Sequence, residues 1–180
     1  MLFGKHRAQR RADRAFDDGV GVTRYQMHQK MLSLGDDFWI EDQSGNRAFK
    51  VDGKALRARK TFHLEDPAGQ RIATIRSRPL RIKDSMSIDA ADGTRIALVK
   101  KALVGPMRDR WHIEQGDGAD LTVHGNLVDH EYTIERDGHK VAEVSKKWFR
   151  VRDTYGLQIG PDVQDTTVLA AAIAIDTMTH

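Results

Sequence analysis

The side chains best suited to chemistry are cations that gather in one stretch of the sequence. From Lys54 to Lys83 the chain has nine Lys and Arg residues and only two acids, Glu65 and Asp66. Arginine presents a planar fork that matches the oxygens of a phosphate or carboxylate group. The pattern predicts a site for an anionic ligand, with the candidate binding residues Arg57, Arg59, Lys60, Arg76, Arg78, Arg81 and Lys83.

These cations form one patch only if the strands that carry them are neighbours. Alternate residues of a β-strand point to the same face. This alternation predicts three outward pairs, Arg57 with Arg59, Arg76 with Arg78, and Arg81 with Lys83. Two interpretations stay open, because the outside of a barrel must be polar somewhere. The patch either binds an anion or is an ordinary solvated face.

A second cationic motif contains an aromatic residue. Lys146 and Lys147 precede Trp148, and Arg150 and Arg152 follow it. A tryptophan among cations can lie at a membrane interface or stack on a nucleic-acid base. Large aromatic side chains more often pack into cores, while lysines protect a sheet edge. We therefore expect Trp148 to close one end of a barrel.

Catalytic and metal chemistry find no support in the sequence. The chain has no cysteine, which excludes disulfides, thiolate metal sites and a cysteine nucleophile. His124 and His130, with Asp129 between them, lack the close paired spacing of a zinc site. The serines have no nucleophile-elbow surroundings, and Gly19-Val-Gly21 lacks the rest of a dinucleotide fingerprint. No enzyme activity, cofactor or metal is expected.

The elements that must position these residues follow a repeated pattern. A strand, an acidic turn ending in Gly and a second strand recur at Ile40–Val51, His63–Ile75, Ile88–Lys100 and Tyr132–Val144. Asp hydrogen-bonds its own backbone in a turn, and Gly accepts the positive φ of a tight hairpin. Pairs such as Ile72-Ala73 and Val141-Ala142 recur in the second strands, and small residues suit a crowded barrel interior. Further strands are predicted at Thr23–Leu32, Asp37–Ile40, Trp111–Glu114, Leu121–Val123 and Tyr155–Ile159.

The chain ends in a different kind of element. After Gly160-Pro161, Asp162 is a good N-cap, and Asp165 lies three residues on, near the positive end of a helix. The segment Thr166–Asp176 is Ala-rich and apolar on every side, which predicts a helix enclosed by protein. It is too short to span a bilayer. We therefore predict an all-β antiparallel barrel around one buried, apolar C-terminal helix.

Length and charge divide the chain into two parts. Its 180 residues fit one domain. The first 15 residues carry five basic groups and one acid, Asp13, with too few apolar positions to anchor a helix. We expect a flexible basic arm at residues 1–20 and a single barrel domain at residues 21–180. No signal peptide is visible, so the expected location is the cytoplasm, including its membrane surface.

Five segments, taken in order, carry a resemblance to a known family. They are Tyr25–Lys54, Leu64–Gly69, Val123–Asn126, Val141–Trp148 and Asp153–Gly156. Over these segments the chain resembles the LURP-one-related proteins of the Tubby C-terminal-like superfamily, which are relatives of the phospholipid scramblases. The resemblance implies a 12-stranded antiparallel barrel around a central hydrophobic helix. It carries over no binding residue, because no Tubby ligand motif maps onto particular positions.

The expected function is that of a non-enzymatic binding module. It would recognise anionic phospholipid head groups, or another phosphorylated ligand, through the Lys54–Lys83 face. The resemblance agrees, since Tubby proteins bind phosphoinositide head groups and scramblases act at membranes. The alternative is a protein-interaction or structural scaffold with no lipid binding. Nucleic-acid binding is disfavoured because no reading motif accompanies the basic segments.

Overall fold

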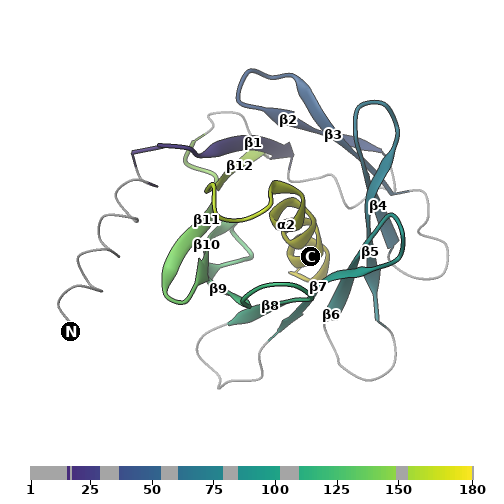
Figure 1. Cartoon of the computed structure of the whole chain (residues 1–180). Coiled ribbons are helices and arrows are strands. Elements are labelled where there is room, and N and C mark those ends of the chain that lie inside the picture. The colour runs from purple at the N-terminus through teal and green to yellow at the C-terminus, as the bar shows by residue number, and fades with distance from the viewer. Residues whose placement is uncertain are drawn as a thin grey trace.

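A computed structural model of the chain describes residue 16 and residues 18–28, 37–53, 61–78, 85–101, 110–148 and 154–179. These residues form twelve antiparallel strands, closed into a barrel, and one C-terminal helix (Figure 1). The elements are β1 (Thr23–His28), β2 (Phe38–Asp42), β3 (Arg47–Asp52), β4 (Thr61–Glu65), β5 (Arg71–Ser77), β6 (Ser85–Ala90), β7 (Arg95–Lys101), β8 (Trp111–Gln115), β9 (Leu121–Asn126), β10 (Glu131–Arg136), β11 (His139–Ser145), β12 (Thr154–Ile159) and α2 (Asp165–Thr179).

The barrel has the simplest topology that twelve strands allow. Each strand pairs with the next one in the sequence, and β1 closes the barrel against β12 with Tyr25 opposite Leu157. The fold class predicted from the repeated hairpins and the apolar C-terminus is therefore confirmed.

The four predicted hairpins share one local design. In each, the register shifts near the end of the first strand, as between Ile40 and Glu41 of β2. Just beyond the shift an acid faces a base, in the pairs Glu41–Arg47, Glu65–Arg71, Asp89–Arg95 and Glu135–Lys140. Such bulges increase the local twist of a hairpin, which helps a sheet to curve into a barrel.

The turns themselves follow from their Asp and Gly residues. In the β2–β3 turn, Asp42 Oδ1 accepts hydrogen bonds from the backbone N–H groups of Ser44 and Asn46, at 2.8 and 2.9 Å. Gly45 has a φ of 80°, which a residue with a Cβ rarely adopts. The acids of these turns thus have a structural role in the hairpins.

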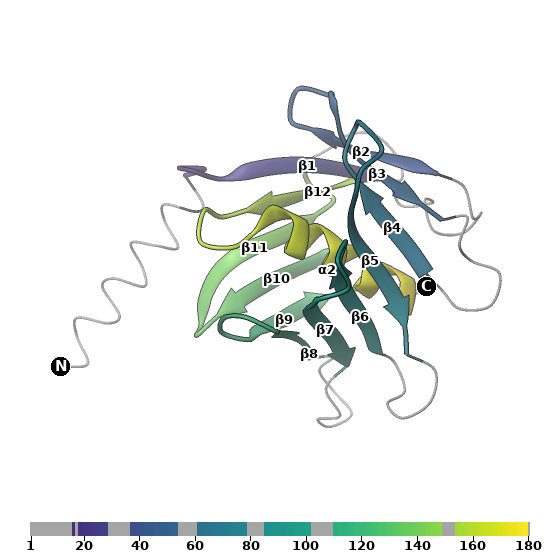
Figure 2. The ribbon, with the colours of Figure 1, turned by 45° about the vertical axis from the view of Figure 1, so that its right-hand side comes forward.

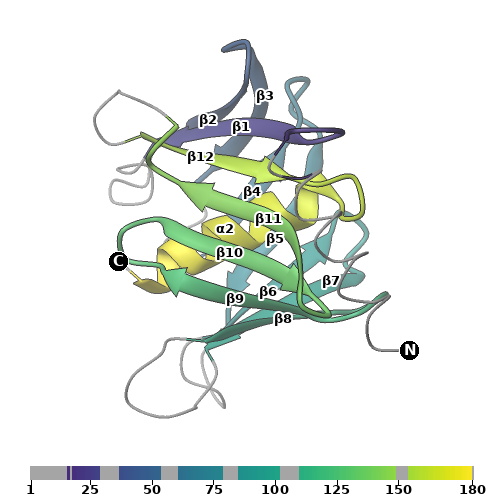
Figure 3. The same ribbon diagram turned by 90° about the vertical axis from the view of Figure 1, so that its left-hand side faces the viewer.

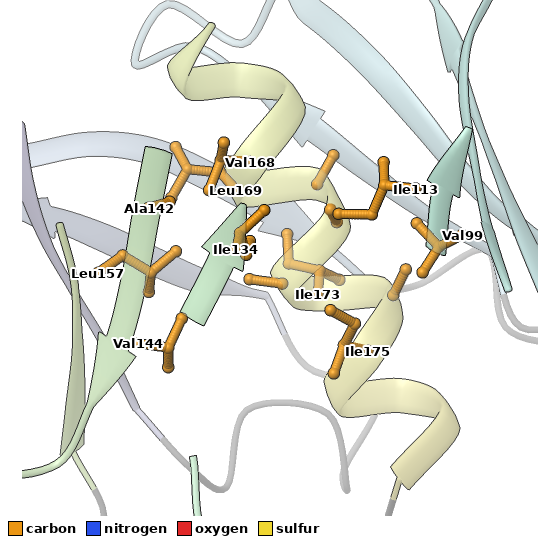
Figure 4. Packing of buried hydrophobic residues seen from close by; sticks show 14 of the residues in the cluster. Val99, Ile113, Ile134, Ala142, Val144, Leu157, Val168, Leu169, Ile173 and Ile175 are labelled. Atoms are coloured by element: carbon orange, nitrogen blue, oxygen red, sulfur yellow. The ribbon is translucent and has the colours of Figure 1, made fainter. Parts of the chain in front are cut away.

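The helix α2 fills the barrel and completes its core. Eleven of its residues, from Thr167 to Thr177, are buried. Figure 4 shows Ile134, Leu157 and Ile113 pointing from the strands toward Leu169 and Ile173 of the helix. The recurring small residues Ala73, Ala97 and Ala142 are almost completely buried, as predicted for a crowded interior.

One predicted boundary was wrong, and another lies outside the described residues. The strand β1 is described as far as His28, and its predicted end at Leu32 falls among residues 29–36, outside the described part. The helix begins at Asp165, and Gln164 rather than Asp162 accepts the first backbone hydrogen bonds, from Thr167 and Val168. The Gly160-Pro161 stretch instead belongs to a longer connection. Pro79 and Pro106 lie outside the described residues.

The antiparallel order gives the barrel two different ends. Short turns between β2 and β3, β4 and β5, β6 and β7, β8 and β9, and β10 and β11 lie at one end, with the β12–α2 connection. We call this the turn end. The other six connections start and finish at the opposite end, the loop end, where the C-terminal end of α2 also lies (Figures 2 and 3). Within the described residues, no helix is long and apolar enough to cross a membrane.

Candidate functional site

The connections at the two ends of the barrel differ sharply in charge. The six connections of the turn end contain no Lys or Arg and six Asp residues, namely Asp66, Asp92, Asp117, Asp120, Asp137 and Asp162. The six connections of the loop end contain six Asp residues and fourteen Lys and Arg residues. The fourteen are Lys30, Lys54, Arg57, Arg59, Lys60, Arg78, Arg81, Lys83, Arg108, Arg110, Lys146, Lys147, Arg150 and Arg152.

This separation arises from the strand topology. Basic segments that are far apart in the sequence all belong to connections of the same end. The turn end also has cations, because Arg47 and Arg71 are exposed there and the basic residues that precede β1 are attached there. Connections rich in cations attract anions to the loop end. The loop end is therefore the candidate site for an anionic partner.

Two of the seven predicted binding residues lie in the described part of the chain. Arg76 and Arg78 are both exposed, on the outer side of β5 and directly after it. The inward residues Ala73 and Ile75 alternate with them, as predicted. The other five candidates lie outside the described residues, and these are Arg57, Arg59, Lys60, Arg81 and Lys83.

The strands that border those five candidates are neighbours in the barrel. Asp52 at the end of β3 pairs with His63 of β4, and Thr61 at the start of β4 pairs with Arg76 of β5. At the end of β5, Ser77 pairs with Met86 of β6. The connections of residues 53–60 and 78–84 therefore begin and end on adjacent strands.

Apolar side chains are also exposed at the loop end. Trp148, in the connection that follows β11, is 38% exposed, and Val128 in the β9–β10 turn is 54% exposed. The expectation that Trp148 closes the barrel was wrong. The core is already filled by α2, and the adjacent Lys147 side chain is 82% exposed, so Lys147 and Trp148 face solvent. The loop end thus combines cations with exposed apolar groups.

Glu131 holds the segment that carries Trp148. Its carboxylate accepts hydrogen bonds from Ser145 Oγ at 2.9 Å and from the backbone N–H of Lys146 at 2.9 Å. Lys147 Nζ lies 3.8 Å from the same carboxylate. These contacts fix the chain just before Trp148 against the start of β10.

A buried polar cluster attaches the last turns of α2 to the loop end. His130 Nε2 lies 2.5 Å from Asp176 Oδ1, and both side chains are buried. The His130 ring stacks on Tyr155 with the ring centroids 4.2 Å apart. His130 has a φ of 54°, an uncommon backbone conformation for a residue with a Cβ. This contact fixes the helix beneath the β9–β10 turn, which carries Val128.

One group of described residues could hold a metal ion, and the sequence analysis missed it. Ligand atoms of Asp52, His63 and Glu65 lie within 4.8 Å of one another on β3 and β4. Burial, followed by the charge of Arg71, lowers the pKa of His63. Lys50 Nζ lies 3.8 Å from Glu65, so cations of the protein already surround these acids. No sequence spacing could reveal this group, because cross-strand pairing brings it together.

Comparison with known proteins agrees with the architecture. The sequence model of the family described as LURP-one-related matches residues 23–176. No curated protein sequence matches the chain. An X-ray structure of a protein from Arabidopsis thaliana is similar, with a TM-score of 0.62 and 18% sequence identity, over 86% of this chain and 88% of that chain. That likeness concerns the fold. The family match spans almost the whole barrel, and the chain belongs to the LURP-one-related family.

Proposed function

We propose that this protein is a binding module that docks its loop end on membranes containing anionic phospholipids. The charge separation between the two ends carries the proposal. An anionic surface attracts the loop end, whose connections are rich in Lys and Arg, and repels the acidic turns. Each Lys or Arg near such a surface contributes about 1 kcal/mol. The family is not known for enzymatic activity.

The exposed apolar residues support a membrane over a soluble anion. Tryptophan is enriched at the boundary between lipid and water, where its ring is partly buried and its N–H remains hydrated. Trp148 stands next to Lys146 and Lys147, and Val128 is exposed at the same end. A phosphate in solution would use the cations alone. A membrane surface uses both kinds of side chain.

Co-sedimentation with vesicles tests the proposal. Wild-type protein is expected to bind vesicles of phosphatidylcholine with phosphatidylserine, and not vesicles of phosphatidylcholine alone. Binding should weaken from low to physiological salt, because ions screen the attraction. The Arg76→Glu/Arg78→Glu variant should lose more than about tenfold in affinity, since two attractive charges become repulsive.

A matched variant tests whether vesicle binding depends on charges at the loop end or only on the net charge of the protein. Arg47 and Arg71 are exposed at the turn end, and Arg71 stands on the same strand as Arg76. The Arg47→Glu/Arg71→Glu variant has the same net charge as the first double variant and should keep its vesicle binding. Equal losses in both variants would refute docking by the loop end. Absence of wild-type binding would refute lipid recognition and leave a protein partner as the function to pursue.

A further inference from the structure

A cleft with a volume of about 620 Å³ lies at the turn end, where three segments meet. Phe16 and Val20 precede β1, the β10–β11 hairpin contributes Arg136, His139 and Lys140, and the connection before α2 completes the lining. Figure 3 shows the hairpin and this connection together, at the end opposite the C-terminal end of α2. The volume falls in the range of about 300–1,000 Å³ that is typical of small-molecule sites.

The apolar wall of the cleft is built around Phe16. Its side chain is only 5% exposed. A Cβ at Gly160 would lie 3.4 Å from the ring and 3.2 Å from the carbonyl oxygen of Val141, so the glycine allows a close approach of both. Lys140 Nζ lies 5.4 Å from the centroid of the Phe16 ring, within cation–π distance. Val20 extends this apolar surface outward and is 68% exposed.

The charged residues of the cleft are arranged by sign. The basic side chains Arg136, His139 and Lys140 are half-buried, whereas the acids Asp137 and Asp162 are exposed. A negative group that enters the cleft therefore meets cations inside, and the acids lie nearer the solvent. The inner part of the cleft is therefore basic, although the connections at this end of the barrel are acidic.

Two nitrogen atoms beside the cleft are not satisfied by the protein. Arg136 Nη1 donates a hydrogen bond to the carbonyl oxygen of Asp162 at 2.8 Å, which holds the guanidinium in place. Arg136 Nε and His139 Nδ1 are buried and have no hydrogen-bond partner among the described residues. Buried polar atoms are almost always hydrogen-bonded in proteins. Both atoms are inaccessible in this structure, so a ligand reaches them only when the two side chains shift, and the shift of Arg136 also moves the group that bonds Asp162.

We propose that this cleft binds a small organic anion, in which one carboxylate is joined to an apolar body. The Arg136 side chain shifts on binding, which exposes the edge formed by Nε and Nη2, and the carboxylate pairs with this edge as a side-on fork. His139 donates from Nδ1, and the apolar body lies against Phe16 and Val20. The acids at the rim favour a single negative charge over the double charge of a phosphate. This site is separate from the loop end and its lipid.

Nuclear magnetic resonance of the full chain tests the site with a defined probe. Titration with 4-phenylbutyrate should shift the amide signals of Val20, Lys140 and Gly160 in a saturable way. Its uncharged amide should bind about tenfold more weakly, a difference of about 1.4 kcal/mol. The Arg136→Gln variant should bind the acid and the amide equally, and urea unfolding shows whether this variant is folded.

A pair of valine variants provides the control. Val20 and Val128 are both exposed, and they stand at opposite ends of the barrel. Val20→Asp should weaken binding of the acid by more than about tenfold, because a negative charge replaces the apolar lip, while Val128→Asp should not. Equal affinities for acid and amide in the wild type, or equal losses in the two valine variants, would overturn the assignment. These outcomes concern the cleft alone. The Val20→Asp variant should still bind vesicles, so failure of the cleft proposal is distinguished from failure of membrane docking.

Discussion

All three tyrosines of the chain resist ionisation in the folded state. Burial, followed by the charge of Asp176, raises the pKa of Tyr132 and of Tyr155 above the ordinary value near 10. Burial also raises the pKa of Tyr25, whose hydroxyl donates a 2.7 Å hydrogen bond to Asp165. Each phenol is therefore neutral over a wider pH range in the fold than in the unfolded chain.

The pH dependence of stability follows from these shifts. A raised pKa in the folded state stabilises the fold fully below the unfolded value, near pH 10, and this stabilisation is lost as the pH rises further. We expect the free energy of unfolding, measured with urea, to decline above about pH 10. Tyrosinate absorbance should appear together with unfolding. Its appearance in protein that is still folded would show that the tyrosines are accessible.

At the scale of elements, Glu131 of β10 determines how the segment after β11 is presented. Glu131→Ala removes acceptors for Ser145 and Lys146, so we expect the free energy of unfolding to fall by about 1–2 kcal/mol. Acrylamide should then quench the fluorescence of Trp148 more strongly. The chain has three tryptophans, so the Trp148→Phe variant is measured as well, to identify the part of the fluorescence that comes from Trp148. Glu114→Ala is the control, because that partly exposed side chain has a surface ion pair with Lys100, worth about 0.5 kcal/mol. Unchanged quenching in Glu131→Ala would contradict the role of Glu131.

The barrel and its helix could be predicted from local signals. The Asp and Gly residues of the turns determine hairpins by backbone chemistry alone, and an apolar Ala-rich segment must be enclosed. The helix start was misplaced because Asp162 has the side chain of a good cap, while the Gly160-Pro161 connection extends past it to Gln164. Local propensity does not determine how far such a connection runs.

The candidate site was only partly predictable. Strand alternation correctly paired Arg76 with Arg78, since the period of two is a property of one strand. The joint position of the basic connections, of Trp148 and of Val128 depends on which ends of twelve strands meet, and this is a long-range property. The exposure of Trp148 was missed for a related reason, because α2 already occupies the interior that Trp148 was expected to close.

At the scale of the whole molecule, the connections between the strands differ in charge along the barrel axis. The hydrogen-bonded wall of the barrel separates basic connections at one end from acidic turns at the other, although the net charge is only +3. A small net charge therefore conceals a large difference in charge between the two sets of connections. The central consequence is that the barrel should bind a membrane in one orientation. A membrane with negative charge should meet the loop end, and the turn end should face the solvent.

Labels at the two ends measure this orientation most directly. The chain has no cysteine, so Val128→Cys and Val20→Cys each accept one environment-sensitive fluorophore at an exposed position. On vesicles with phosphatidylserine, we expect a blue shift for the label at residue 128, at the loop end, and none for the label at residue 20. A blue shift at residue 20 alone, or equal shifts at both positions, would contradict docking through the loop end.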